Sequence, residues 1–331
     1  WQAGLAGGRI QRSRGFEATR QQQLQHHRPA VGLQLQHVFA GVRVGRREVD
    51  GQPVVDRLAE LLLQGQVLHA DETPVQQLDP GQGKTKRDYM WAYRSNDLEG
   101  APRIVVFDYQ TSRSGVHARN FLQEWRGHLM VDDYGGYKES FRQGVTELAC
   151  LAHCRRKFFD LHAVGGHPVA AEVLRRIGEL YAIEPQAREG DVAARLALRQ
   201  QHAMPKLIAL HAWLIAQRVK TADGTGLARA IDYSLKRWPA LMRYVDNGAL
   251  PIDNNPAENA IRPITLGRRN WLFTGSERAG CRAAAIQSLL ATAKLNGLEP
   301  YAWLRDTLER LPTWPYSRID ELLPIRAVAA A

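Results

Sequence analysis

The chain has 331 residues, of which 44% are hydrophobic and 24% charged, and its formal net charge is +10. This is ordinary globular composition for one large or two medium domains. No apolar run approaches the roughly 20 residues that a membrane-spanning helix needs, and three cysteines are too few for a disulfide framework. The basic surplus favours a polyanionic partner, with nucleic acid first and an anionic membrane second; a merely basic soluble enzyme is the alternative.

Residues 1–52 do not have the pattern of a folded domain. They are rich in Gln, Arg, Gly and Val with few periodic apolar positions, so we expect them to be disordered or weakly helical. The chain starts at Trp1 without a signal peptide, and we expect a fragment of a cytoplasmic protein. From Pro53 to Leu62 the apolar residues fall at helical spacing, which predicts a short amphipathic helix.

The stretch from residue 68 to residue 164 predicts an α/β fold. Three aromatic and β-branched runs, at 68–73, 89–93 and 103–109, are separated by turn residues and predict an antiparallel meander. The elements expected after them are a helix at 117–125, a strand at 128–132, a short helix at 137–142, a strand at 146–152 and a helix from 155. Strands alternating with helices indicate a mixed sheet covered by helices on both faces.

The second half of the chain predicts helices only. Residues 165–248 carry apolar residues at helical spacing without a strand signal, which indicates an all-helical insertion. Residues 53–164 and 249–311 then form the two parts of one core, and we expect the second part to be helical with breaks at Pro263 and Gly275. Residues 312–331 are expected to be a peripheral tail.

Two carboxylates stand at the ends of predicted strands. Asp71 ends the first strand and Asp132 ends the fourth, so neighbouring strands would bring both within reach of one divalent cation. Oxygen ligands suit Mg²⁺ or Mn²⁺. Glu72 and Asp133 are the competing choices, because each lies one residue further on. An Arg or Lys partner is the alternative to a metal, since a buried carboxylate needs compensation.

Glu258 is a third acidic candidate with a strong structural alternative. Asn255 as N-cap, Pro256 at the first helical position and Glu258 at the third would form a capping box, and Glu258 could also pair with Arg262. This pattern by itself favours a structural role.

A zinc site at Cys150, His153 and Cys154 is disfavoured, because a strand-to-helix junction cannot easily fold three such close ligands around one ion. We expect a small buried cysteine and a hydrogen-bonded histidine there.

Three basic clusters could contact phosphates. They are Lys84-Thr85-Lys86-Arg87, Arg155-Arg156-Lys157, and Arg268-Arg269 followed by Asn270-Trp271. Basic groups beside an aromatic ring suit a phosphate backbone with a base or sugar packed on the ring. A solvated charged face is the ordinary alternative, but two of the clusters flank acidic candidates.

Several long motifs occur together in one order. They are 69–74 (HADETP), 131–137 (VDDYGGY), 150–158 (CLAHCRRKF), 253–263 (DNNPAENAIRP), 267–273 (GRRNWLF) and 289–297 (LLATAKLNG). In this order they resemble the transposases of the insertion sequence 66 family over about residues 53–311. Residues 1–52 do not resemble the family, which suggests an out-of-frame translation fused to the core, and residues 325–331 also drift from it.

The resemblance implies a DDE transposase with a ribonuclease-H-like catalytic core. The family's acidic triad lies in its D-E-T-P, D-x-Y-x-x-Y and N-N-x-x-E motifs, which correspond here to Asp71, Asp132 and Glu258 and favour Asp132 over Asp133. The implied cofactor is a pair of Mg²⁺ or Mn²⁺ ions, and the implied partner is double-stranded DNA at element ends and target. A homo-oligomer, accessory element-encoded proteins and a bacterial nucleoid location are expected by analogy.

Overall fold

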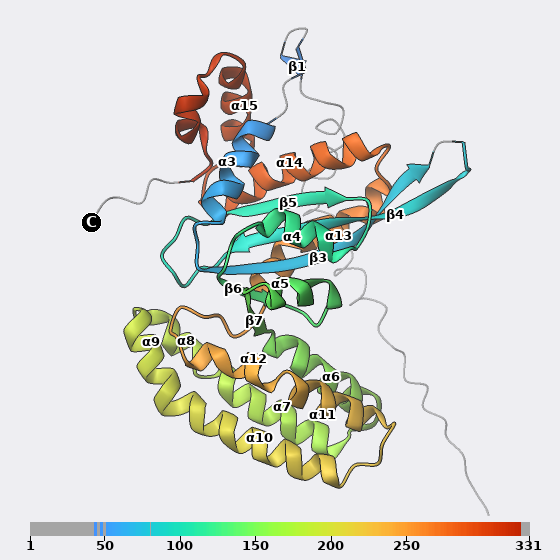
Figure 1. Ribbon diagram of the computed structural model, residues 1–331, viewed down its shortest axis with the longest axis vertical. Coiled ribbons are helices and arrows are strands. Elements are labelled where there is room, and N and C mark those ends of the chain that lie inside the picture. The colour runs from blue at the N-terminus through green and yellow to red at the C-terminus, as the bar shows by residue number, and fades with distance from the viewer. Residues whose placement is uncertain (1–42, 45–46, 49–50, 80, 326–331) are drawn as a thin grey trace, which may run out of the picture. The chain divides into compact units, whose positions relative to one another are not determined.

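The computed structural model describes residues 43–44, 47–48, 51–79 and 81–325 (Figure 1). The expectations for residues 1–42 and 326–331 lie outside these ranges. The described residues belong to one compact unit. The first described elements are two strands of two residues each: β1 (Arg43–Val44) pairs antiparallel with β2 (Arg47–Glu48).

A five-stranded mixed sheet is the centre of the fold. Its strands are β3 (Val67–Asp79), β4 (Lys84–Ser95), β5 (Val105–Gln110), β6 (His128–Val131) and β7 (Thr146–Ala149), in the spatial order β5-β4-β3-β6-β7. The first three strands pair antiparallel, and β6 and β7 add parallel strands on the other side of β3. The predicted meander and mixed sheet are confirmed.

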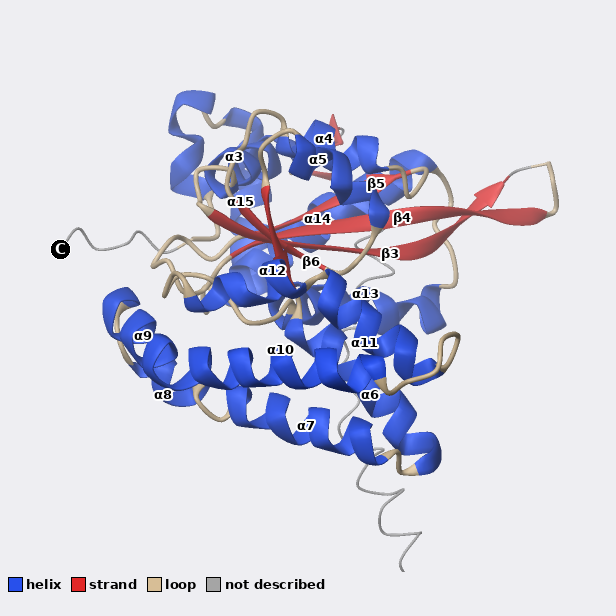
Figure 2. Cartoon of the chain, turned by 60° about the horizontal axis from the view of Figure 1, so that its bottom comes forward, coloured by secondary structure: helices blue, strands red, loops and turns tan. Residues whose placement is uncertain are grey.

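Strands β3 and β4 extend further than predicted. Their pairing continues to Asp79 opposite Lys84, so the expected loop at 81–87 is mostly strand. Figures 1 and 2 show this two-stranded arm projecting beyond the rest of the sheet. Side chains 81–87 are exposed and carry no apolar period. The arm is defined by cross-strand pairing and by backbone hydrogen bonds that Thr274 exchanges with Gln76 and Leu78. The fifth strand ends at Ala149, earlier than predicted, because a helix begins at Leu151.

Helices cover both faces of the sheet, as predicted. One face, with Leu68 and Trp91, packs on α3 (Gln52–Leu62), α4 (Gly115–Leu122) and the turns η1 (Gly135–Tyr137) and α5 (Lys138–Arg142). The opposite face packs on α13 (Asn255–Trp271). Helix α14 (Glu277–Leu295) runs beside the edge strand β5 (Figure 1), where its Thr292 and Ser288 hydroxyls accept the backbone N–H groups of Val105 and Phe107. Helix α15 (Pro300–Arg310) and the turn η4 (Leu311–Thr313) follow α14.

Residues 165–248 contain helices and no strand. After α6 (Leu151–Gly165) come α7 (Pro168–Tyr181), α8 (Glu184–Glu189), α9 (Val192–Leu198), the π-helical turn η2 (Arg199–Ala203), α10 (Met204–Val219), α11 (Gly226–Lys236), α12 (Trp238–Met242) and η3 (Arg243–Val245). They share one apolar core with Val67 and Met130 of the sheet. Among the described helices, none has the length and hydrophobicity that a bilayer-spanning segment requires.

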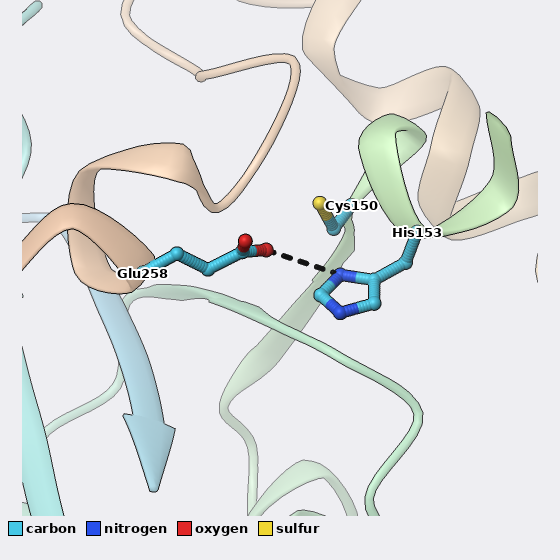
Figure 3. Close-up of side chains that lie close together, drawn as sticks. All are labelled: Cys150, His153 and Glu258. Carbon is cyan, nitrogen blue, oxygen red and sulfur yellow. Dashed lines mark ion pairs between the residues drawn. The ribbon is translucent and has the colours of Figure 1, made fainter. Parts of the chain in front are cut away.

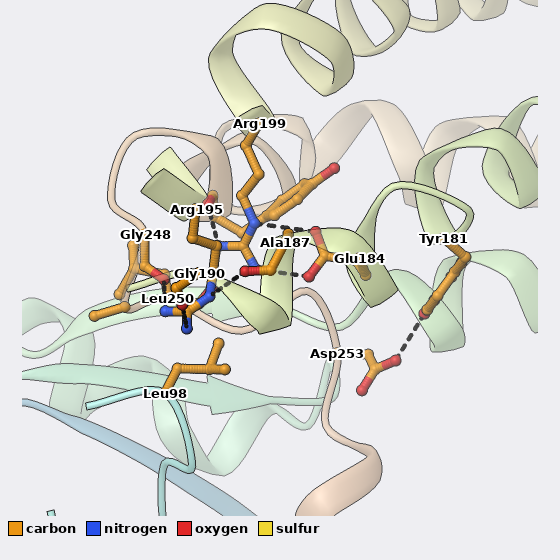
Figure 4. A network of polar contacts seen from close by, with 12 residues as sticks. Leu98, Tyr181, Glu184, Ala187, Gly190, Arg195, Arg199, Gly248, Leu250 and Asp253 are labelled. Atoms are coloured by element: carbon orange, nitrogen blue, oxygen red, sulfur yellow. Dashed lines mark hydrogen bonds and ion pairs between the residues drawn. The ribbon is translucent and has the colours of Figure 1, made fainter. Parts of the chain in front are cut away.

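Two buried arginines join this helical region to the segment that returns to the sheet (Figure 4). Arg199 pairs with Glu184 at 2.7 Å and donates to the carbonyls of Tyr244 and Leu250. Arg195 donates to the carbonyls of Ala187, Gly190 and Gly248. These bonds satisfy backbone carbonyls that helix ends leave unpaired, so the return segment has a defined path.

Two expectations for the C-terminal region are wrong. Helix α13 continues through Pro263, because Ile261 and Ile264 pack against the sheet on either side of that residue; the expected break near Gly275 is confirmed. The tail is not peripheral within its described part. Ile319 and Leu322, in the turn η5 (Tyr316–Leu322), are buried in the core that includes α3.

Candidate active site

The pairing of β3 with β6 brings two acidic residues to neighbouring positions. His69 lies opposite Met130 in a parallel register, and β6 ends at Val131. Asp71 and Asp132 each follow this pair by two residues. Side chains two residues apart share a face of a strand, so Asp71, inside β3, lies on the face of His69. Asp132 is the first residue after β6. The structure therefore places Asp132 within electrostatic range of both Asp71 and Glu72.

Glu72 belongs to the opposite face, where its charge is compensated. Its Oε1 accepts a hydrogen bond from Arg113 Nε at 2.7 Å and its Oε2 accepts one from the Tyr137 hydroxyl at 2.8 Å. Within the described chain Asp71 has no such ion pair and accepts only the Glu72 backbone N–H, at 2.9 Å. In the described chain Glu72 is therefore held by side-chain partners, whereas Asp71 has none.

The electrostatic environment of Asp71 opposes its ionisation. Burial, followed by the charges of Glu72, Asp132 and Glu258, raises the pKa of Asp71 to about 8. The influence of Glu258 means that the third acidic candidate lies within electrostatic range of Asp71, although 187 positions separate the two in the sequence. Three carboxylates so placed require positive charge nearby.

Asp132 and Asp133 have different partners. Asp132 Oδ1 accepts the backbone N–H of Tyr134 at 2.8 Å, which fixes the turn after β6. Asp133 Oδ1 lies 2.8 Å from Arg237 Nη1 in an ion pair. Asp133 is thus compensated by a cation, whereas Asp132 remains beside Asp71.

Glu258 is positioned by the start of α13. The helix is preceded by Asn254, whose amide accepts from His69 Nδ1 at 3.0 Å and donates to the Ala70 carbonyl at 2.9 Å. These bonds join the first turn of α13 to β3 directly before Asp71. The predicted capping box is wrong, because Asn254 and not Asn255 precedes the helix and the Asn254 side chain is used across the fold.

A cleft of about 330 Å³ opens beside these carboxylates. Its lining comprises Asp71, Glu72, Thr73, His153, Arg156, Glu258, Ile261, Arg262 and Thr265. Asp132 does not line this cleft; it follows β6, the strand next to β3, and its charge contributes to the raised pKa of Asp71. Arg262 was expected only as a partner of Glu258. Its position one turn further along the same helix face was the signal for a place in the cleft.

The predicted basic residues lie in different surroundings. Arg156 lines the cleft, and with Arg155 it also lines an adjacent cavity of about 470 Å³. Lys157 lies over the Tyr233 ring, 5.2 Å from its centroid. Arg268 donates to the Thr73 hydroxyl at 3.3 Å and to the Pro74 carbonyl, so it also joins α13 to β3. Arg269 is exposed.

Two protein-family matches together cover nearly the whole chain. Residues 16–282 match the family described as "Transposase IS66 family", and residues 288–325 match the "IS66 C-terminal element". The chain belongs to the IS66 transposase family. The family match is longer than the expected 53–311. It includes residues 16–52, so the expectation that this segment does not resemble the family is wrong from residue 16 onward.

Relatives of this IS66 chain occur in Sinorhizobium fredii. The uncharacterized protein y4qI is 33% identical over 305 residues, which cover 88% of this chain and 57% of that protein. The uncharacterized protein y4jD is 34% identical over 285 residues, which cover 82% of this chain and 56% of that protein. The chain therefore spans little more than half the length of these relatives. A solved structure, the Drosophila P element transposase strand transfer complex, aligns over 84% of this chain and 74% of that one, with 13% identity and a TM-score of 0.26.

Proposed function

We propose that this chain is the catalytic part of an IS66 transposase, with a ribonuclease-H-like core that cleaves DNA and transfers the cut strand. Family membership supports a transposase. An antiparallel meander followed by two parallel strands, with acidic residues at the boundary between them, supports the ribonuclease-H-like assignment. The helical residues 165–248 then form an insertion between the second and third acidic residues.

The observation that carries the proposal is the state of Asp71. It is half-buried within electrostatic range of Asp132 and Glu258, and no described cation forms an ion pair with it. An all-oxygen donor set fits Mg²⁺ or Mn²⁺. Asp71, Asp132 and Glu258 would hold two such ions. When bound, these ions supply Lewis-acid stabilisation of the phosphoryl transition state and lower the pKa of a coordinated water or hydroxyl.

The remaining residues of the cleft would bind and orient DNA. Arg156 and Arg262 flank the carboxylates and would contact phosphate oxygens next to the bond that breaks. Arg155, Lys157, Arg268 and Arg269 extend the basic surface. Glu72, held by Arg113 and Tyr137, keeps the turn after β6 against β3, so Asp71 and Asp132 retain their relative positions.

The proposed reaction has two steps of the same type. Water attacks a phosphate at the element end, the P–O3′ bond breaks, and a free 3′-hydroxyl results. This hydroxyl then attacks a phosphate of the target DNA and displaces its 3′-oxygen, with inversion and without a covalent enzyme intermediate. Two element ends must meet for this reaction, so we propose a homo-oligomer on double-stranded DNA.

Iron-mediated backbone cleavage tests whether the three segments share one metal site. The purified chain is loaded with Fe²⁺ in place of Mg²⁺ and treated with ascorbate and peroxide. Breaks clustering near Asp71, Asp132 and Glu258 together, and suppressed by excess Mg²⁺, are expected. Breaks scattered along the chain or confined to one segment would contradict the shared site.

A DNA assay separates the enzyme from the alternative, a non-catalytic DNA-binding remnant. A functional core nicks DNA carrying the element ends when Mg²⁺ is added, and Asp71→Asn abolishes nicking while DNA retention persists. DNA retention by the unsubstituted chain without Mg²⁺-dependent nicking would identify a remnant.

A further inference from the structure

Cys150, His153 and Glu258 converge where α6 and α13 begin (Figure 3). One ligand atom from each, the thiol sulfur, an imidazole nitrogen and a carboxylate oxygen, lies within 4.8 Å of the other two. His153 Nδ1 is 3.5 Å from Glu258 Oε1. Three donors this close can reach one cation through side-chain rotation, with the backbone unchanged.

The backbone around this cluster is held in place from both sides. Cys150 directly precedes α6, and the N–H of Leu151 donates to the Ile252 carbonyl at 3.1 Å. The N–H of Asn254 donates to Cys150 Sγ at 3.2 Å. Burial raises the pKa of the Cys150 thiol to about 12, and this backbone donor opposes the shift only in part. A bound cation would supply the positive charge that favours the thiolate.

One of the three donor atoms is buried without a hydrogen-bond partner in the described chain. His153 Nδ1 is buried but forms no hydrogen bond, although a hydrogen-bonded histidine was expected here. Its separation from Glu258 is that of an ion pair and not of a hydrogen bond. A buried nitrogen without a partner costs free energy, and a metal ion would remove that cost. The Glu258 side chain is 35% exposed, so a fourth ligand such as water can enter from the cleft.

The donor chemistry distinguishes this cluster from the all-oxygen set at Asp71 and Asp132. One sulfur, one nitrogen and one oxygen suit Zn²⁺ or a similar borderline-soft divalent cation, at ligand distances of about 2.0–2.3 Å. We propose that Cys150, His153 and Glu258 form a binding site for a zinc-class divalent cation, with one position open to solvent. Glu258 is then shared between this site and the Asp71–Asp132 cluster.

This site differs from the zinc site considered from the sequence. Cys154 takes no part, because its thiol lies 3.1 Å from the Ser234 hydroxyl inside the helical core. The third ligand comes from α13, more than 100 residues away in sequence. Cys154 therefore provides a matched control for Cys150.

Cobalt(II) titration tests the site on the full chain without DNA. The exposed Cys281 is first replaced by serine, so that it cannot bind the probe. We expect one equivalent of Co²⁺ to bind with a thiolate-to-cobalt charge-transfer band, and Zn²⁺ to displace it. Cys150→Ser should abolish the band and weaken binding by more than about 100-fold, since loss of outer-shell partners alone costs roughly 10–100-fold. Cys154→Ser should retain the band.

Binding without a thiolate band, a band that survives Cys150→Ser, or no binding at equimolar Co²⁺ would each overturn the site. Urea unfolding without metal checks that Cys150→Ser is folded. If it is not, His153→Ala replaces it, because that ring is partly exposed, and loss of Co²⁺ affinity is again expected. Since no DNA or Mg²⁺ is involved, failure here leaves the proposed transposase activity intact, and failure of DNA cleavage leaves this site intact.

Discussion

Arg237, directly after α11, forms an ion pair with Asp133, with Nη1 and Oδ1 2.8 Å apart. Its second terminal nitrogen lies 2.8 Å from Glu147 Oε1, and the arginine side chain is only 4% exposed. A buried guanidinium needs compensation of its charge, which these two anions supply. Asp133 therefore serves the packing of the helical region against the sheet, and Asp132 is the acidic residue available beside Asp71.

This assignment predicts that substitutions of Asp132 and Asp133 affect different properties of the protein. Asp132→Asn should lower Mg²⁺-dependent nicking at least about 100-fold, because metal-dependent transition-state stabilisation is worth several kcal/mol. Asp133→Asn should change nicking by less than about 3-fold and reduce the free energy of unfolding by about 1 kcal/mol, since Arg237 keeps Glu147 and Asp133 is partly exposed. Nicking rates and urea unfolding measure both. Equal loss of nicking in the two variants would refute the assignment.

The raised pKa of Asp71 predicts how stability depends on pH without metal. The folded protein keeps a proton on Asp71 between its ordinary pKa of 3.8 and about 8, whereas the unfolded chain releases it. The free energy of unfolding therefore falls as pH rises through that range. Asp71→Asn should stabilise the metal-free protein at pH 8 by about 1–3 kcal/mol, and less towards pH 4.

Urea unfolding with a chelator, at several pH values, measures this difference. Excess Mg²⁺ is the control, because binding to the folded wild type should reduce the advantage of Asp71→Asn. A difference that does not change with pH would show that Asp71 is ionised throughout.

The position of Arg156 in the cleft predicts one phosphate contact, which the salt dependence of DNA affinity can measure. Arg156→Gln should weaken DNA binding and reduce the slope of log affinity against log salt by about 1, since one phosphate contact is lost. Arg305→Gln is the matched control, because Arg305 is an exposed arginine paired with Glu309 on α15. Filter binding or fluorescence anisotropy across a salt series measures both. Equal slopes in the two variants would remove Arg156 from the interface.

Asn254 and Asn255 are adjacent but should differ strongly in their effect on stability. Asn254→Ala removes the side-chain partner of His69 Nδ1 and of the Ala70 carbonyl, both of which are buried. Each lost partner should lower the free energy of unfolding by about 1–3 kcal/mol. Asn255→Ala removes one partly exposed hydrogen bond to Asp253 and should cost under about 1 kcal/mol. Urea unfolding compares them. A small loss in Asn254→Ala would mean that this contact does not position α13.

The buried pair of Arg199 and Glu184 predicts a non-additive pair of substitutions. Glu184→Gln leaves Arg199 buried without its anion and should cost about 3–5 kcal/mol. Replacing both residues with apolar side chains of similar size should cost less than the two single changes together. A double-mutant cycle in urea unfolding measures the coupling, and additive losses would show that the pair is not coupled.

Much of the fold follows from local patterns in the sequence. The apolar period at 54–62, the aromatic and β-branched runs of the meander and the helical spacing of residues 165–248 each predict an element that the structure contains. Such patterns operate over a few residues, because burial of one face of a helix or strand depends on side chains within the same segment. The ends of predicted strands indicate Asp71 and Asp132 as acidic candidates, and the family motifs add Glu258 to them.

Other features depend on residues far apart in the chain. Nothing local predicts that Asn254 bonds to His69, 185 positions away, or that Arg237 selects Asp133. The continuation of α13 through Pro263 likewise depends on packing of Ile261 and Ile264 against the sheet. The sequence by itself thus determined which elements form and which side chains carry charge. Only the tertiary structure decided which of those charges meet, because the partner of a buried polar group is chosen by the packing of whole elements.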